Sequence, residues 1–373
     1  MGFEMWILVT GSKGFIGKNL VAELKNQGFT DIMEYDKDTE EAALYDYCKK
    51  ADMIYHLAGV NRPKEESEYK EGNYGFTKIL LQTLKSCKNT CPIMASSSIQ
   101  AKHQNPYGMS KKEEEDLLFD YAKEYGVTVY VYRLPNVFGK WCRPNYNSVI
   151  ATFCYNIARN LPISVDAPNK VLHLAYIDDV IEELLGLLTN IKHISGNFCE
   201  ITTVYSVTLR DIINLLYSFK ESRSNKIIPD MGNLFIKKLY AVYLSYLPVE
   251  DICYKLDMNF DHRGSFTEFV KSLEQGQVSI NISKPGITKG NHWHHTKNEK
   301  FLVVSGKGVI RLRNIYDEKV IEFFVSAENL EVVDIPVGYT HNIENIGDTD
   351  MVTVMWANES YNPDKPDTYY LKV

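Results

Sequence analysis

The sequence predicts two folded parts in one chain: an α/β domain built on a doubly wound parallel sheet with a substrate lobe, followed by an all-β barrel. Three observations support this. The apolar run Met5–Thr10 is followed at once by a glycine-rich turn and a helical pattern. Short apolar strands and helical stretches then alternate as far as Arg133. Beyond residue 252, strand-like segments follow one another with Gly, Pro, Asn and Asp between them.

Length and composition restrict the class of protein. A chain of 373 residues is long for one core, so we expect a first domain over residues 1–247 and a second over 252–373, joined by a short linker at Pro248–Asp251. The net charge of −7 argues against a nucleic-acid partner. No apolar run has the ~18–20 residues of a membrane span, and the N-terminus leads straight into a strand rather than a signal peptide. The seven cysteines are scattered without a CxxC pair, which favours a reduced, cytoplasmic setting.

The first strand and its turn indicate a dinucleotide site of the Rossmann type. Glycines at 11, 14 and 17 stand between the strand and a helical pattern that ends at Gly28, where a pyrophosphate can approach the helix N-terminus. We expect contacts to the dinucleotide from this turn, namely from Gly11, Lys13, Gly14, Phe15, Ile16 and Gly17. The next strand ends in Asp36-Lys37: the carboxylate suits the ribose hydroxyls of NAD, whereas the lysine suits the extra phosphate of NADP. The sequence leaves this choice open.

A second pattern indicates proton transfer to a carbonyl oxygen. Tyr107 and Lys111 are four residues apart at the start of a predicted helix and therefore share a face. An ammonium beside a phenol stabilises the phenolate, which makes Tyr107 a candidate proton donor. A hydroxyl at the end of the preceding strand, Ser97 or Ser98, is expected to hold the same oxygen.

The second domain carries a predicted metal site. His292 and His294 lie two apart on one strand face, Glu299 follows on the next strand, and His341 comes after a Pro/Gly turn. Three imidazoles and one carboxylate suit Zn, Fe, Mn or Ni and leave room for water or substrate.

The first domain resembles the extended short-chain dehydrogenase/reductase family over roughly residues 5–245. The resemblance rests on the glycine turn, Leu57-Ala58-Gly59, Asn73, the serine run, Tyr107/Lys111 and the segment Arg133–Gly139. It implies Ser98, Tyr107 and Lys111 as catalytic residues. It also implies coenzyme contacts from Leu57, Ala58, Gly59, Asn73, Tyr107, Lys111, Leu134 and Asn136. Family members that dehydrate nucleotide sugars carry Asp-Glu after the hydroxyl residue; Ile99-Gln100 stands here, which favours plain reduction. The family builds its substrate lobe after Gly139, where Arg143 and Asn147 are expected to hold a diphosphate.

The second domain resembles the cupins. Their first motif has the spacing of Gly286, His292, His294, Glu299 and Gly306, and their second that of Pro336, Gly338, His341 and Asn345, with Leu330 in place of its usual opening glycine. The order of the two domains resembles the CapF-type family of bifunctional capsular polysaccharide synthesis enzymes. That resemblance implies a homodimer with Zn²⁺ on His292, His294, Glu299 and His341. It implies that the cupin epimerises C3 of a UDP-2-acetamido-2,6-dideoxy-4-hexulose and that the first domain reduces the C4 ketone with NADPH. Asp36 departs from the basic loop expected for NADPH, so NADH stays possible.

Several alternatives stay open at this point. The base that moves the C3 proton is Lys297, His295 or Tyr339, and Lys297 is also a candidate substrate contact. The metal is either catalytic or structural. In one alternative, the cupin is a non-catalytic module for dimerisation or ligand binding. In another, the first domain is an epimerase with tightly held NAD.

Overall fold

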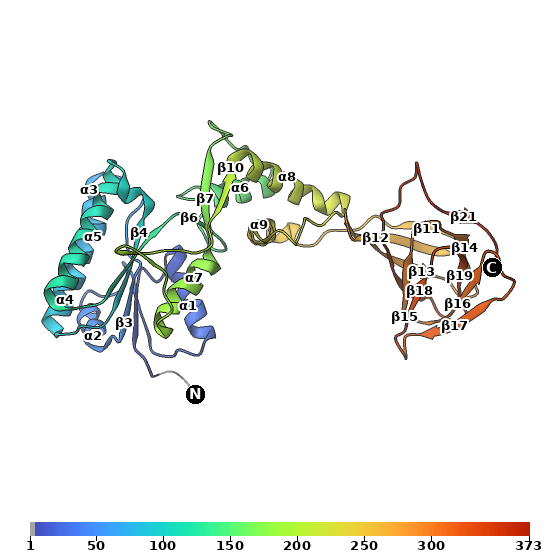
Figure 1. The fold of residues 1–373 in the computed structure, drawn as a ribbon, viewed down its shortest axis with the longest axis horizontal. Coiled ribbons are helices and arrows are strands. Elements are labelled where there is room, and N and C mark those ends of the chain that lie inside the picture. The colour runs from blue at the N-terminus through green and yellow to red at the C-terminus, as the bar shows by residue number, and fades with distance from the viewer. Residues whose placement is uncertain (1–3) are drawn as a thin grey trace. The chain divides into compact units, whose positions relative to one another are not determined.

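In the computed structural model, which describes residues 4–373, the chain divides into two compact units (Figure 1). The first contains the residues up to Leu216 together with Lys238–Leu247; the second contains Tyr217–Lys237 and Pro248–Val373. The sequence placed the boundary only at the linker near Pro248. The structure also groups Tyr217–Lys237 with the second unit, because the backbone of Lys271 exchanges hydrogen bonds with Lys226 and Ile228, at 2.8 Å each.

The first unit is built on a seven-stranded sheet in the order β2-β1-β3-β4-β5-β9-β8. All neighbours are parallel except β8 and β9. The strands are β1 (Ile7–Thr10), β2 (Ile32–Tyr35), β3 (Met53–His56), β4 (Ile93–Ser98), β5 (Val129–Leu134), β8 (Ile194–Ser195) and β9 (Phe198–Cys199). The predicted parallel sheet is therefore confirmed.

Helices cover both faces of this sheet (Figure 1). On one face lie α2 (Ala43–Lys50), α4 (Phe76–Cys87) and α5 (Pro106–Tyr125); on the other lie α1 (Phe15–Asn26) and α7 (Ile177–Gly186). Strand β1 shows why its sequence is a continuous apolar run. Ile7 and Val9 are buried in the core under α1, while Leu8 is buried in the core under α4. Both faces of a parallel strand are buried in this way.

The strand order reverses at β1, because β2 lies on one side of it and β3 on the other. The connections after β1 and β3 therefore leave the sheet in different directions and open a crevice at the strands' carboxyl ends.

A smaller sheet, β10-β7-β6, and further helices follow. Its strands are β6 (Asn136–Phe138), β7 (Val171–Tyr176) and β10 (Tyr205–Thr208). The later helices are α6 (Val149–Ala158), α8 (Leu209–Asn225) and α9 (Leu234–Ser245). Short helical turns are α3 (Ser67–Tyr69), η1 (Lys70–Gly75), η2 (Ile99–Lys102), η3 (Leu187–Thr189) and η4 (Val249–Asp251).

The second unit contains two sheets in which all the strand pairs are antiparallel. One has the order β11-β12-β13-β20-β15-β18 and the other β17-β16-β19-β14-β21. The strands are β11 (Asn259–Asp261), β12 (Gly264–Ser272), β13 (Gly276–Ser283), β14 (Thr288–Trp293), β15 (Glu299–Ser305), β16 (Lys307–Asn314), β17 (Ile321–Ser326), β18 (Val332–Ile335), β19 (Tyr339–Asn345), β20 (Met351–Ala357) and β21 (Tyr369–Tyr370). An apolar core that includes Phe301, Ile310 and Ile343 takes residues from both sheets.

Within residues 4–373, no helix has both the length and the apolar character needed to cross a membrane.

Candidate functional site

The carboxyl ends of the parallel strands open into a cleft of about 1770 Å³. The cleft collects nearly all the residues that the sequence predicted for the first domain. Those that line it are Gly11, Lys13, Gly14, Phe15, Ile16, Gly17, Asp36, Lys37, Leu57, Ala58, Gly59, Ser97, Ser98, Tyr107, Lys111, Leu134, Asn136, Arg143 and Asn147. Segments far apart in sequence meet there because parallel strands end at the same edge of a sheet.

The turn after β1 needs glycines because other backbone segments approach it closely. Gly11 has φ +68°, and a Cβ there would lie 2.7 Å from the backbone nitrogen of Ala58. A Cβ on Gly17 would lie 2.2 Å from the carbonyl oxygen of Gly11. Helix α1 begins right after Gly14 with no side chain capping its first N–H groups. The turn therefore offers unpaired donors and the positive end of a helix dipole to an anion.

Asp36 lies at the end of β2 and organises the neighbouring backbone. Its carboxylate accepts hydrogen bonds from the backbone nitrogens of Lys13 and Lys37, each at 2.8 Å. The ammonium of Lys13 pairs with Asp38 instead. Both predicted determinants of coenzyme choice, an acid and a base, thus face the same end of the cleft.

Tyr107 and Lys111 lie in the first turns of α5. The helix begins at Pro106, and Asn105 caps it by accepting a hydrogen bond from Gly108 N at 2.7 Å. The Lys111 side chain is buried; its ammonium donates to Glu114 Oε2 at 2.7 Å and to the carbonyl of Ser96 at 3.0 Å. Burial alone would lower the pKa of Lys111, but the nearby Glu114 and Tyr107 raise it above its ordinary value. A charged ammonium is therefore available beside the Tyr107 phenol.

The structure distinguishes the two candidate serines. Ser97 is buried, and its hydroxyl donates to Glu115 Oε1 at 2.5 Å. Glu115 is also held by two hydrogen bonds from Arg133, at 2.8 and 2.6 Å. Ser98 is only half-buried, and its hydroxyl oxygen accepts a long bond of 3.2 Å from Gln100 N. The Ser98 hydroxyl proton stays available to a ligand, whereas that of Ser97 is engaged.

Asn73 is placed behind the cleft rather than on its wall. It is fully buried, its amide oxygen accepts from Val60 N at 2.8 Å, and its amide nitrogen donates to Ser110 Oγ at 2.9 Å. These contacts fix the loop after β3 against α5. Asn73 thus supports the loop that lines the cleft, and its direct contact with a coenzyme stays a prediction.

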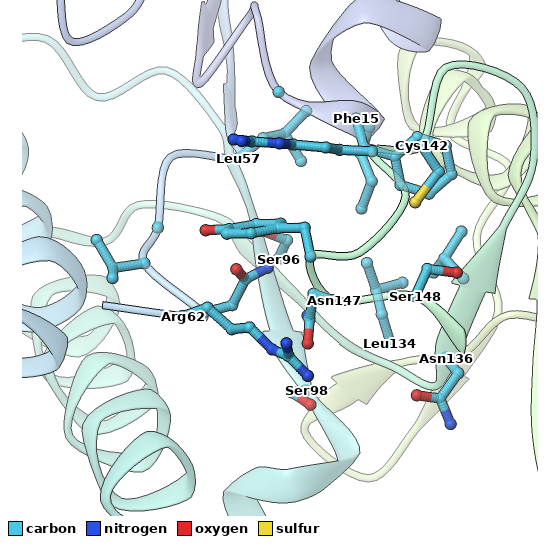
Figure 2. A pocket seen from close by; sticks show the side chains of 18 of the residues that line it. Phe15, Leu57, Arg62, Ser96, Ser98, Leu134, Asn136, Cys142, Asn147 and Ser148 are labelled. Atoms are coloured by element: carbon cyan, nitrogen blue, oxygen red, sulfur yellow. The ribbon is translucent and has the colours of Figure 1, made fainter. Parts of the chain in front are cut away.

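Sequence reasoning missed Arg62, which follows β3 by six residues and lines the cleft. Figure 2 shows its side chain extending toward Ser98, near Asn147 on the opposite loop. Lys170 and His173 also line the cleft from the lobe. Lys170 and His173 stand at no fixed spacing from the sequence motifs. Only Arg62 could have been found from the sequence, because it closely follows Leu57-Ala58-Gly59.

The second unit brings the four predicted metal ligands together. His292 lies on β14, His294 directly follows that strand, Glu299 begins β15, and His341 is on β19. One ligand atom from each lies within 4.8 Å of the others. A β-bulge between Gly290 and His292 sets His292 opposite His341 in the ladder.

The unpaired atoms of this cluster fit a metal ion. His294 Nε2, His341 Nε2 and Glu299 Oε2 are buried without hydrogen-bond partners in the described part of the chain. Glu299 Oε2 lies 3.4 Å from His294 Nε2 and 3.1 Å from His341 Nε2. Orphaned buried polar atoms are rare unless a ligand completes them, and this donor set and spacing suit a tetrahedral or five-coordinate ion.

The electrostatics of the cluster support the same conclusion. Burial lowers the pKa of His292 to about 4, and the neighbouring His341 and His294 act in the same direction. Burial alone would raise the pKa of Glu299, but the facing imidazoles hold it well below its ordinary value. Neutral imidazole and ionised carboxylate are the forms that bind a metal.

The three candidate bases have different surroundings. Lys297 is buried, and its ammonium donates to the Pro366 carbonyl and to Thr368 Oγ1, each at 3.3 Å, which favours a structural role. His295 is exposed and packs its ring edge-on against Trp293 and Tyr369. Tyr339 is half-buried and packs against the core between the sheets.

Two family models match this chain. The NAD dependent epimerase/dehydratase family matches residues 7–198, and the polysaccharide biosynthesis C-terminal domain matches residues 259–369. A UDP-2-acetamido-2,6-beta-L-arabino-hexul-4-ose reductase of Pseudomonas aeruginosa is 38% identical over 369 residues, which span 99% of each chain.

Solved structures of similar proteins cover the same length. The capsular polysaccharide assembling protein CapF of Staphylococcus aureus is 56% identical, with a TM-score of 0.94 over 99% of this chain and 100% of that chain. A structure of CapF with the inhibitor 3-isopropenyl-tropolone is 53% identical, with a TM-score of 0.90 over 99% of this chain and 100% of that one.

Proposed function

The chain belongs to the CapF family within the NAD-dependent epimerases and dehydratases, and from this premise we propose that it is a bifunctional nucleotide-sugar enzyme of capsular polysaccharide synthesis. The second unit, a zinc-binding cupin barrel, epimerises C3 of UDP-2-acetamido-2,6-dideoxy-4-hexulose. The first unit then reduces the C4 ketone with NADPH to UDP-2-acetamido-2,6-dideoxy-L-talose, a precursor of UDP-N-acetyl-L-fucosamine. The proposal is supported by the cleft of the first unit, which Ser98, Tyr107 and Lys111 line, and by the clustering of His292, His294, Glu299 and His341 in the second unit.

In the first unit, a nicotinamide coenzyme held in the cleft would supply the hydride for C4. Tyr107 donates its phenolic proton to the C4 oxygen, and the Ser98 hydroxyl orients that oxygen. Lys111 supports the resulting phenolate. We expect Arg62, Arg143 and Asn147 to hold the diphosphate, since two guanidinium groups and an amide line the same cleft. Ile99-Gln100 follows Ser98, so no acidic pair stands where dehydration would need one.

In the second unit, His292, His294, Glu299 and His341 would hold a zinc ion, which would stabilise negative charge on the ketone oxygen. A ketone acidifies the C–H bond beside it, and stabilising the enolate lowers the barrier to removing that proton. Tyr339 is the candidate base that the surroundings favour, because Lys297 is engaged by the Pro366 carbonyl and Thr368. The exposed ring of His295 packs against Trp293 and Tyr369. The tropolone found with a related CapF is consistent with a metal site, because the adjacent oxygens of a tropolone chelate metal ions.

The two reactions support each other. Epimerisation beside a ketone is reversible, and reduction of that ketone removes the acidity of the neighbouring C–H bond. The second step therefore fixes the configuration that the first step sets. The homodimer stays a prediction, which light scattering of the full-length protein checks.

NMR of the 4-ketosugar in D₂O tests the proposal. Wild type with NADPH is expected to give the alcohol with deuterium at C3. Tyr107→Phe is expected to exchange the C3 proton but to form no alcohol. Absence of exchange in wild type without coenzyme favours a non-catalytic second unit. Product formation without consumption of NADPH favours an epimerase with tightly held NAD, and a Tyr107→Phe enzyme that reduces normally rules out the role of Tyr107.

A further inference from the structure

The loop between His294 and Glu299 joins two of the proposed metal ligands, and a segment much later in the chain holds it. The carboxylate of Asp367 accepts four hydrogen bonds from this loop. They come from the backbone nitrogens of His295 at 3.0 Å, Thr296 at 2.9 Å and Lys297 at 3.1 Å, and from Thr296 Oγ1 at 3.0 Å. One anionic side chain thus replaces the hydrogen bonds that a tight turn would otherwise leave to water.

The backbone of Asp367 directly contacts His294, one of the proposed metal-ligating residues. His294 Nδ1 lies 2.5 Å from the Asp367 carbonyl oxygen. A carbonyl accepts but cannot donate, so Nδ1 carries the proton and the lone pair is on Nε2. His294 Nε2 is the atom that lies 3.4 Å from Glu299 Oε2 and has no hydrogen-bond partner in the described part of the chain. The carbonyl therefore selects both the tautomer and the ring orientation that a metal requires.

The position of Asp367 is imposed by its surroundings. Its φ is +33°, in a region that side-chain-bearing residues rarely adopt. Strand β21, two residues later, pairs with β14 so that Tyr370 lies opposite His292 and Tyr369 opposite Trp293. The segment is thus anchored to the same strand that carries the ligands, and Asp367 is held in an unfavourable conformation between that anchor and the loop.

We propose that Asp367 is a positioning residue of the metal centre: its carboxylate fixes the loop from His294 to Glu299, and its carbonyl fixes the ring of His294. The proposal rests on the zinc site of the proposed function and adds a residue that contributes no ligand atom.

Zinc affinity of the full-length protein tests it, measured by competition with a chromophoric chelator. Asp367→Asn removes the charge and places N–H donors against the loop's own donors, so we expect zinc affinity to fall by about 10- to 100-fold. Asp364→Asn is the control, because it removes the same charge from an exposed position three residues earlier. The control is expected to bind zinc as wild type does.

A second variant covers the case in which Asp367→Asn does not fold. Thr296→Val removes one of the four hydrogen bonds and is expected to weaken zinc binding by a smaller factor. Cobalt-substituted protein gives a readout of ligand geometry: its visible absorption bands should shift in Asp367→Asn and not in Asp364→Asn.

The outcomes separate the two proposals. If wild type binds zinc and both Asp367→Asn and Thr296→Val match its affinity and cobalt spectrum, the role of Asp367 is overturned and the zinc site stands. If wild type binds no zinc, the metal site of the proposed function is overturned, and the role of Asp367 with it.

Discussion

Lys111 Nζ lies 2.7 Å from Glu114 Oε2, and both side chains are buried, so the lysine of the proposed reductase site has a buried counterion on its own helix. This arrangement keeps an ammonium charged where water would otherwise have to solvate it. A buried pair of this kind makes the fold sensitive to the loss of either partner.

Glu114→Gln is therefore expected to lower the free energy of unfolding by about 3–5 kcal/mol, because it leaves the Lys111 ammonium without its counterion. Denaturant unfolding measures the loss. Glu113→Gln is the control: its carboxylate is half-exposed and lies 3.9 Å from Lys70, so we expect a change below about 1 kcal/mol. Equal stability of wild type and Glu114→Gln would show that Lys111 does not depend on this pair.

Substitutions of the two serines at the end of β4 are expected to have different effects, one on catalysis and the other on stability. Ser98→Ala is expected to reduce kcat by about 10²–10³-fold, the usual effect of losing one donor to a developing oxyanion. Ser97→Ala leaves Glu115 one donor short and is expected to reduce stability by about 1–3 kcal/mol, with kcat near the wild-type value. Steady-state kinetics and thermal unfolding check both variants; the reverse pattern would move the catalytic role to Ser97.

His56 makes the first unit sensitive to acid. Burial lowers the pKa of His56 to about 3, and Thr10 and Thr77 each hold a ring nitrogen at 2.8 Å. The unfolded histidine titrates near 6.5, so the unfolded state binds more protons between the two values. The contribution of neutral His56 to the free energy of unfolding is therefore fully present above about pH 6.5. It falls by up to about 1.4 kcal/mol per pH unit as the pH drops toward 3.

Urea unfolding at pH 7 and pH 5 tests this dependence. Wild type should lose about 2 kcal/mol more than His56→Gln over that interval, because the glutamine does not titrate. An identical loss in the two proteins would assign the acid sensitivity to other groups.

We expect the preference between NADPH and NADH to depend on Asp36. Its carboxylate favours ribose hydroxyls and repels a 2′-phosphate, whereas Lys13 and Lys37 attract that phosphate. Asp36→Ala is expected to raise the ratio of kcat/KM for NADPH over NADH by about tenfold, equivalent to about 1.4 kcal/mol. Glu40→Ala, an exposed carboxylate further along the same loop, should leave the ratio unchanged. A fall in the ratio for Asp36→Ala would show that the carboxylate organises the phosphate site through Lys13 and Lys37.

Metal removal should affect only the second unit. His341→Ala, or treatment of wild type with a chelator, is expected to abolish zinc binding and to slow C3 exchange more than about 10²-fold, since a metal supplies several kcal/mol of charge stabilisation. Binding of NADPH should persist. His295→Ala is the matched histidine control, because that ring packs outside the cluster against Trp293 and Tyr369. Zinc content, deuterium exchange and coenzyme fluorescence are the measurements.

The parts that sequence predicted are those fixed by local spacing. Gly14 and Gly17 approach the carbonyl oxygen of Gly11 within one turn, and His292 and His294 are two residues apart, which is the period of a strand. Their placement follows from rules that act over a few residues. The antiparallel second unit and the parallel first sheet follow from the same periodic signals.

The parts that sequence did not predict depend on contacts between distant segments. Asn73 matches a family position, yet its place behind the cleft depends on Val60 and Ser110, which no spacing rule connects to it. The grouping of Tyr217–Lys237 with the second unit depends on a backbone pairing with Lys271. The hydrogen bonds of Lys297 to Pro366 and Thr368 come from residues far along the chain, which no local spacing predicts.

The position of Asp367 after all four ligands in the sequence has a consequence for biosynthesis. A ribosome releases His292, His294, Glu299 and His341 before it releases the residue that orients His294. A metal ion bound by the emerging chain would be held by side chains that Asp367 does not yet orient, and would exchange readily with ions in solution. If Asp367 orients His294 as proposed, the complete donor set forms only after this late residue has left the exit tunnel.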